Sequence, residues 1–171
     1  MFYLATTRFT TKTWNEHKEW FNKKNNLKNK ELKSFYNSPN KICDKVPLQA
    51  KVLVIEMNND TNQILGIGII KNSLWNSKKC NIHSDNRYNR YFYKGVDEKR
   101  IDRKDLLNQK VKIKNVEISL LILIEEICFS GSTHSKRHRG ITLLPKSILN
   151  NKHINLFKLF HNIILNQNKS V

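Results

Sequence analysis

The sequence is poor in cysteine, and its three cysteines lie far apart. Cys43, Cys80 and Cys128 are odd in number and unevenly spaced, which is not the pattern of a disulfide framework and suits a reducing compartment. Cys80 and His83 have the C-x2-H spacing of half a zinc site, but no second pair supplies the remaining ligands. We therefore predict no metal site and interpret the thiols as buried or incidental.

Long apolar runs are also missing. No stretch of 18 apolar residues occurs, so we predict no membrane span. The first residues, MFYLATTRFTTKTW, lack the charged start, apolar middle and cleavage site of a secretory signal. These two absences lead us to expect an intracellular, cytoplasmic protein.

Acidic residues are scarce, since 14 Asp and Glu stand against 31 Lys and Arg and leave a net charge of +17. Such a charge suggests a polyanionic partner, because Lys and Arg displace counterions from phosphates. However, 65 of the 171 residues are Lys, Asn or Ile, as in translation of a very A+T-rich genome. Only 7 of the cations are Arg, the residue suited to bidentate phosphate contacts. The placement of the arginines is therefore more informative than the total charge.

The motifs of common catalytic and cofactor-binding sites are absent. The sequence has no glycine-rich phosphate loop ending in Lys-Ser/Thr and no dinucleotide fingerprint. It has no HExxH, nucleophile elbow or kinase set. Its aspartates are scattered through polar segments and do not supply the acidic cluster of a two-metal nuclease. We predict no cofactor, and a binding protein fits the sequence better than an enzyme.

What is present indicates a single α+β domain spanning the chain. Its most secure element is a β-hairpin, because two strand-like runs, Val52–Met57 and Ile64–Ile70, flank the turn-forming residues 58–63. Gly66 and Gly68 share one face of the second run. Glycine in a strand marks a bulge, a bend or a close approach, and in small barrels we expect the bend.

Periodicity and turn chemistry predict the remaining elements. Thr13 and Glu16 have the spacing of a capping box, and Pro145 suits the first turn of a helix. The apolar run Val116–Phe129 is long enough for a helix, although its β-branched content leaves a buried strand open. The remaining predicted elements are strands at 2–7 and 141–144, helices at 14–24, 101–107, 116–129 and 145–149, a docked amphipathic C-terminal helix at 154–166, and a long polar loop at 23–45.

Residues 87–95 form a predicted aromatic strand interleaved with cations. A period of two puts Tyr91 and Tyr93 on one face and Phe92 on the other. Aromatic rings beside arginines suit base stacking combined with phosphate pairing. A half-buried strand with snorkelling cations explains the pattern equally well. On the first interpretation the candidate nucleic-acid-binding residues here are Arg87, Arg90, Tyr91 and Tyr93.

A basic loop at residues 131–142 concentrates cations between two glycines and separates two apolar segments. Such a loop is what a phosphate contact site needs. A solvent-exposed turn without a ligand would have the same sequence pattern. We predict that the cations of this loop pair with phosphates, and that Thr7 and Arg8 line the same binding site. The candidate binding residues of the loop are Ser132, His134, Lys136, Arg137, His138, Arg139 and Gly140.

The order of elements resembles the PUA-like superfamily, particularly its EVE and YTH branches. The resemblance is carried by the strand Phe2–Thr7 and by the hairpin of Val52–Glu56 with the Gly-x-Gly strand Ile64–Ile70. It implies a small β-barrel flanked by helices that binds nucleic acid, often a modified or flipped base in an aromatic pocket. The aromatic cage of YTH domains is not matched residue by residue. The chain also looks like uncharacterised proteins of large cytoplasmic DNA viruses, which would place it in the host cytoplasm or a viral factory.

These features predict a nucleic-acid-binding module, with RNA favoured over DNA because such barrels read unpaired bases more readily. The alternative is a metal-independent enzyme that cleaves RNA or processes bases. In it, His134 and His138 would act as general acid and base beside Lys136. A third possibility is a protein that neutralises a genome without selectivity. The sequence does not indicate an oligomeric state.

Overall fold

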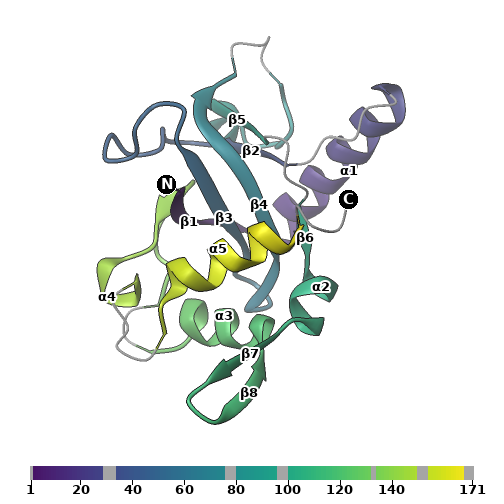
Figure 1. Cartoon of the computed structure of the whole chain (residues 1–171). Coiled ribbons are helices and arrows are strands. Elements are labelled where there is room, and N and C mark those ends of the chain that lie inside the picture. Colours follow the sequence, from purple (N-terminus) through teal and green to yellow (C-terminus); the bar gives the residue numbers. More distant parts are fainter. Residues whose placement is uncertain are drawn as a thin grey trace.

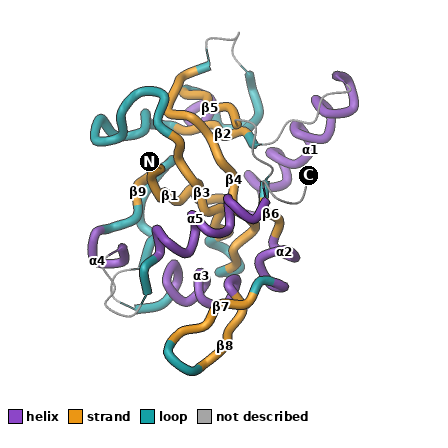
Figure 2. Tube along the Cα trace, viewed as in Figure 1, coloured by secondary structure: helices purple, strands orange, loops and turns teal. Residues whose placement is uncertain are grey.

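A seven-stranded sheet, curled into a half-barrel, forms the centre of the computed structural model (Figures 1 and 2). The structure describes residues 2–28, 34–75, 80–95, 100–131, 134–149 and 154–167, without the side chains of 25–28 and 163–167. Helices and strands are both present, which confirms the predicted α+β class.

The strand order is β2-β5-β4-β3-β1-β9, with β6 paired to β4. The long strands β1 and β3 are parallel, and the other pairs in the sheet are antiparallel. Parallel neighbours need a crossover connection, and the segment that contains α1 supplies it. The bounds are β1 (Phe2–Phe9), β2 (Phe35–Ser38), β3 (Lys51–Asn58), β4 (Gln63–Leu74), β5 (Tyr91–Gly95), β6 (Ile101–Asp102) and β9 (Thr142–Leu143).

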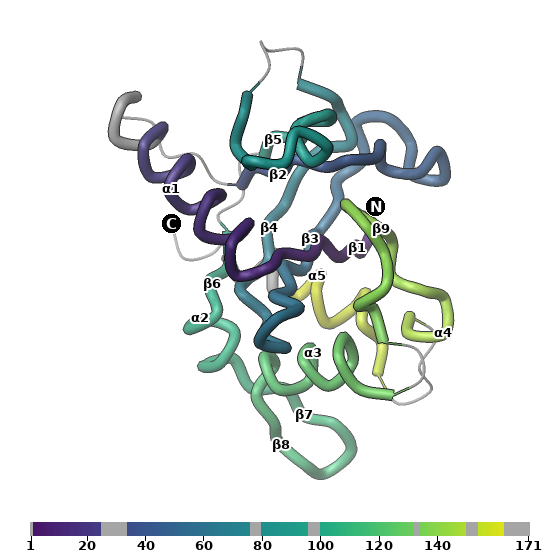
Figure 3. The backbone as a smooth tube through the Cα atoms, turned by 180° about the vertical axis from the view of Figure 1, so that it is seen from behind, coloured from purple at the N-terminus to yellow at the C-terminus, as the bar shows by residue number. Residues whose placement is uncertain are grey.

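The helices cover both faces of the sheet. Helix α1 lies behind the sheet in Figure 1 and in front of it in Figure 3, whereas α5 lies on the opposite face. A separate two-stranded hairpin, β7–β8, stands below α3. The bounds are α1 (Thr11–Lys28), the 3-10 helix η1 (Asn86–Asn89), α2 (Arg103–Asn108), β7 (Lys110–Ile113), β8 (Val116–Ser119), α3 (Leu120–Phe129), α4 (Lys146–Leu149) and α5 (Leu156–Gln167).

Strand β3 contributes side chains to two hydrophobic cores, because its side chains alternate between the two faces of the sheet. Leu53 and Ile55 join the core that contains α3 and α5. Val52 and Val54 join the core on the α1 side. This strand is buried on both faces, which explains its continuous apolar sequence.

The predicted hairpin is confirmed, since β3 and β4 pair antiparallel and the register runs from Lys51–Lys71 to Asn58–Gln63. Both glycines of β4 mark close approaches, and Gly66 also borders a register shift in the pairing with β3, between Glu56 and Met57. A Cβ on Gly68 would meet the Tyr36 hydroxyl and would lie 2.7 Å from Ser34 Oγ, and one on Gly66 would meet the Arg100 guanidinium. Glycine is required where the side chains of Tyr36 in β2 and of Arg100, just before β6, cross the strand.

Several local predictions differ from the structure. The predicted strand at 87–95 is a strand only from Tyr91, because Asn86–Asn89 form the 3-10 helix η1, which Asp85 caps by accepting a hydrogen bond from the Arg87 amide. The predicted loop at 23–45 contains the end of α1 and all of β2. Thr13 does not cap a helix with Glu16, because α1 begins at Thr11 and the Thr13 amide donates to Thr10 Oγ1 at 3.1 Å. The run 116–129 divides into strand β8 and helix α3, and Ser119 occupies the N-cap position between them.

The C-terminal helix is present as α5, and Leu156 and Phe160 are buried in the core of the α5 face. The amphipathic character of the whole helix stays a prediction, because its side chains are described only to residue 162. Among the helices of the described ranges, none combines the length and apolarity needed to cross a membrane.

Candidate functional site

A pocket of about 240 Å³ brings the end of β1 together with the loop that precedes β9. We call it the basic pocket, because four cations line it and no carboxylate is among its described lining residues. The pairing of β1 with β9 brings together segments more than a hundred residues apart in the sequence. The lining residues are Thr7, Arg8, Phe9, Thr10, Thr13, Asn37, Pro39, Asn59, His83, Tyr88, Lys136, Arg137, His138, Arg139 and Gly140.

Arg8 organises the wall of this pocket. Its Nε donates to the carbonyl of Ser135, and its Nη1 donates to the Gly140 carbonyl at 3.4 Å and to Thr142 Oγ1 at 2.9 Å. Its Nη2 donates to Thr6 Oγ1 at 2.7 Å. The rigid fork of a guanidinium makes this divergent set of contacts possible. Arg8 therefore ties the basic loop to β1.

The acceptors around Arg8 are all uncharged. Burial lowers the pKa of Arg8 to about 10, so the group still carries its charge at pH 7. The nearby thiol of Cys128 does not balance that charge, because burial raises its pKa to about 12. A partly buried cation held only by dipoles favours the approach of an anion.

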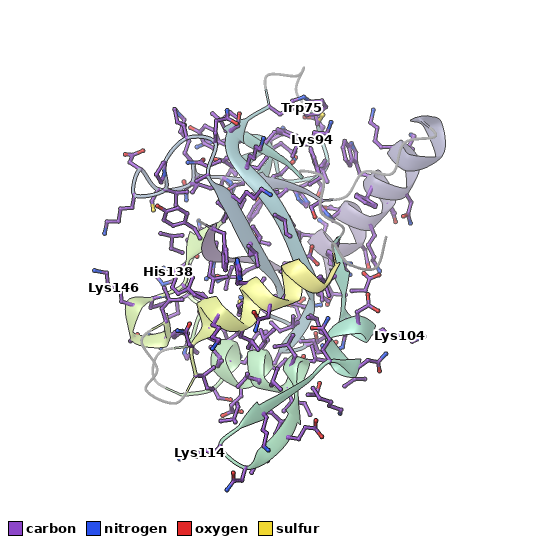
Figure 4. The ribbon with its side chains drawn as sticks, viewed as in Figure 1. Trp75, Lys94, Lys104, Lys114, His138 and Lys146 are labelled. Atoms are coloured by element: carbon purple, nitrogen blue, oxygen red, sulfur yellow. The ribbon has the colours of Figure 1, made fainter. Side chains whose placement is uncertain are left out.

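The basic loop is fixed at its base and exposed at its tip. Ser135 is buried, and its amide donates to the Cys128 carbonyl at 2.9 Å. Gly140 is buried with a φ of 74°, and a Cβ there would meet Ser38 Oγ and lie 3.2 Å from Pro39. Between these anchors, Arg137, His138 and Arg139 are exposed. His138 stands on the side of the molecule away from Lys104 (Figure 4).

The structure gathers seven of the predicted site residues in the basic pocket. They are Thr7, Arg8, Lys136, Arg137, His138, Arg139 and Gly140. Ser132 lies outside the described residues. His134 is not among the lining residues, and its Nδ1 accepts a hydrogen bond from the Lys136 amide at 3.4 Å. The histidine pair of the alternative enzyme is therefore not brought together in this pocket.

The candidates from residues 87–95 line a different hollow, of about 680 Å³, which contains Arg87, Arg90 and Tyr91. Arg87 already has a carboxylate partner, because its Nη2 lies 2.7 Å from Asp85 Oδ2. The two hollows adjoin in sequence through η1, since Tyr88 lines the basic pocket and Asn89 lines the second hollow.

Tyr93 is a wrong prediction as a base-stacking residue. Its side chain is 1% exposed within the core of the α1 face, and its hydroxyl accepts a hydrogen bond from the Ile42 amide at 2.9 Å. The predicted alternation is correct, because Tyr91 packs against the same core and Phe92 joins another cluster. The shared face of the tyrosines is the buried one. A strand sequence gives the alternation but does not say which face meets the core.

The other eight lining residues of the basic pocket were not predicted as site residues, and His83 and Tyr88 are two of them. The sequence singled out His83 only for its spacing from Cys80, and Tyr88 lies in the predicted aromatic strand but was not among its candidate binding residues. In the structure the two rings meet edge to face, with centroids 6.0 Å apart. His83 Nδ1 lies 3.2 Å from Glu16 Oε2, and the described residues contain no group of three metal-ligating side chains. The contact of Glu16 in α1 with His83 could not be predicted from the sequence, because it joins residues far apart in the chain.

A third concavity, the aromatic pocket, has a volume of about 460 Å³. Trp14, Phe21 and Phe35 line it, and a buried ion pair of Glu56 with Arg100 forms part of its wall. Arg100 Cζ lies 5.6 Å from the centre of the Trp14 ring. These contacts join α1 to β3 and to the residue before β6, and Trp14 packs against the core of the α1 face.

Comparison with family models, curated proteins and solved structures gave no match to this chain.

Proposed function

We propose that this protein is a nucleic-acid-binding module that holds a phosphate in the basic pocket. The observation that carries the proposal is the lining itself, with four cations and no carboxylate among the described lining residues. The chain has 14 acidic residues, and none of them is among the described lining residues, so the cations dominate the charge at the pocket surface. Phosphate groups bind where such cations and backbone amides converge.

The roles of the cations differ. Arg8 is committed to the fold through its four acceptors and contributes a fixed positive charge at the pocket wall. Arg137 and Arg139 are exposed, and no carboxylate partner is found for them among the described residues. In this proposal they pair directly with phosphate oxygens, with Lys136 beside them.

Base contacts fall to Tyr88 in this proposal. Tyr88 is half-buried and is the tyrosine of the basic pocket. Stacking of a base on such a ring contributes about 1–3 kcal/mol. A nucleic-acid strand that leaves the basic pocket past Tyr88 would reach the hollow that Arg90 and Tyr91 line. We favour RNA over DNA, and a PUA-like barrel as the scaffold, which the curled half-barrel sheet supports.

A salt titration tests the proposal. Binding of a fluorescent single-stranded RNA is measured by anisotropy over a range of salt concentrations. Changing Lys136, Arg137 and Arg139 together to Ala should flatten the slope of log affinity against log salt by about two units, since each phosphate contact contributes about 0.7 on a single strand.

The matched control changes Lys110, Lys112 and Lys158 to Ala. These lysines are exposed on β7 and α5 and do not line the basic pocket. The control removes the same charge and should leave most of the slope in place. An equal loss of slope in both variants, or no loss in the first, would remove the basic pocket from the binding surface.

A further inference from the structure

His83, which is 5% exposed, also lines the basic pocket. The side chain of Asn89 holds the backbone here, because the amides of Ile82 and His83 both donate to its Oδ1 at 3.1 Å. Asn89 Nδ2 donates in return to the His83 carbonyl at 2.6 Å. These contacts fix the position of the His83 ring.

Glu16 fixes the tautomer of His83. Glu16 Oε2 lies 3.2 Å from His83 Nδ1, and Ser84 Oγ donates to Glu16 Oε1 at 2.7 Å. Burial raises the pKa of Glu16, but the hydrogen bonds from Ser84 and His83 outweigh it, and the net shift is downward. The ionised carboxylate can only accept hydrogen bonds, so Nδ1 of His83 carries the proton.

The other ring nitrogen of His83 therefore presents a lone pair. Burial lowers the pKa of His83, against the opposing effect of Glu16, so the ring is neutral at pH 7. Across the described part of the chain, no hydrogen-bond partner is found for its Nε2. A carboxylate–histidine pair that leaves one nitrogen free is a pre-oriented acceptor.

A second acceptor lines the same pocket. Asn37 is 8% exposed, and its Nδ2 donates to Asn89 Oδ1 at 3.0 Å. Its own Oδ1 is buried and has no partner among the described residues. Unpaired buried polar atoms are uncommon and need an explanation. A pocket lined by cations and by residues with unpartnered acceptors suits a ligand with both an anion and a hydrogen-bond donor.

We propose that His83, positioned by Glu16, accepts a hydrogen bond from a donor group of a nucleotide whose phosphate is bound by the basic loop beside Arg8. This inference rests on the proposed function and specifies the ligand at that site. The donor is either the ribose 2′-hydroxyl or an N–H of the base. In the first case His83 distinguishes RNA from DNA, and in the second it selects the base.

The test compares three probes with wild type, His83→Phe and Glu16→Gln. The probes are a short uridine RNA, the same RNA with 2′-O-methyl groups, which lack the ribose donor, and the same RNA with N3-methyluracil, which lacks the base donor. Phenylalanine keeps a ring but has no lone pair. In Glu16→Gln the new side-chain amide can donate a hydrogen bond to Nδ1. The His83 proton can then move to Nε2, which no longer accepts a hydrogen bond. We expect either variant to weaken uridine RNA binding about tenfold.

Glu19→Gln is the matched control, because Glu19 is exposed on the same helix and the change in charge is identical. It should bind all three probes as wild type does. The salt slope of His83→Phe and Glu16→Gln should also match wild type, because their phosphate contacts remain. If His83→Phe does not fold, as judged by circular dichroism, Glu16→Gln carries the test.

The probes separate the two donors. A tenfold loss by wild type on the 2′-O-methyl RNA alone assigns the ribose, and a loss on the N3-methyl RNA alone assigns the base. In each case His83→Phe should no longer distinguish that probe from uridine RNA. Binding of all probes by both variants at wild-type strength, with a normal salt slope, would overturn the role of His83 and leave the nucleic-acid function standing. Loss of that function would appear instead as an unchanged slope in the Lys136, Arg137 and Arg139 variant.

Discussion

The hydroxyl of Tyr36 donates to Glu56 Oε1 at 2.6 Å inside the half-barrel. Glu56 is 1% exposed, and Arg100 binds its carboxylate through both Nε and Nη2. The pair raises the pKa of Arg100, although burial alone would lower it. Burial raises the pKa of the Tyr36 hydroxyl well above its usual value, with the Glu56 charge acting in the same direction. This buried network links β2 and β3 to the residue that precedes β6.

Removing the cation from this network should be strongly destabilising. Arg100→Met leaves the Glu56 carboxylate buried without its partner, which typically costs about 3–5 kcal/mol. Urea unfolding followed by circular dichroism measures the change. Arg87→Met is the control, because its ion pair with Asp85 is exposed and should contribute little. A small effect of Arg100→Met would mean that water reaches Glu56.

Gly68→Ala tests the close approach of Tyr36 to β4. The added methyl would meet the Tyr36 hydroxyl and would lie 2.8 Å from its Cζ, and both belong to a buried ring. We expect a loss of about 1–3 kcal/mol or more, as in other overpacked cores. Gly131→Ala is the comparison, because nothing lies within 4 Å of its added Cβ and only its φ of 78° opposes the change. Equal losses in thermal unfolding would contradict the steric explanation.

His17 should make the protein less stable in acid. Burial lowers the pKa of His17 to about 3, and the unfolded chain titrates near 6.5, so the unfolded state binds more protons between these values. Stability is therefore complete above pH 6.5 and falls as the pH decreases toward 3, by at most about 1.4 kcal/mol per pH unit from this residue.

His17→Phe should remove most of this slope. The His17 ring stacks on Trp14 and Tyr36, and its Nδ1 is buried without a partner among the described residues. Phenylalanine fits the same aromatic stack and removes the unpaired atom. Stability at pH 7 should be equal to or above that of wild type. Unfolding curves from pH 4 to 8 measure both quantities, and parallel pH profiles would mean that other groups cause the acid sensitivity.

Arg8→Lys should loosen the basic loop without changing the net charge. A lysine cannot reproduce the fork that joins Ser135, Gly140 and Thr142. Amide hydrogen exchange should accelerate at Ser135 and Ile141, whose amides donate to the Cys128 carbonyl and to Ser38 Oγ. Arg139→Lys, at the exposed tip, should leave both rates unchanged. Protection that survives Arg8→Lys would show that the anchors of the loop lie elsewhere.

The residues of the chain determined much of its local structure without help from the fold. The apolar runs and the polar turn at 58–63 specify the hairpin, because hydrophobic periodicity and turn chemistry act within a few residues. The same local rules predicted β1, β9 and the presence of helices α2, α4 and α5. They also identified the cationic character of the basic loop and the alternation of Tyr91, Phe92 and Tyr93.

Only the tertiary structure decided which of these residues meet. Arg8 and the basic loop come together because β1 pairs with β9, and His83 receives its partner from α1, contacts that depend on long-range packing. Burial separated Tyr88, which lines the pocket, from Tyr93, which lies in the core. The packing also explains Gly68, because only a residue without a side chain leaves room there for Tyr36. A short-range pattern fixes the conformation of a segment, whereas its neighbours in space follow from the free energy of the whole packed chain.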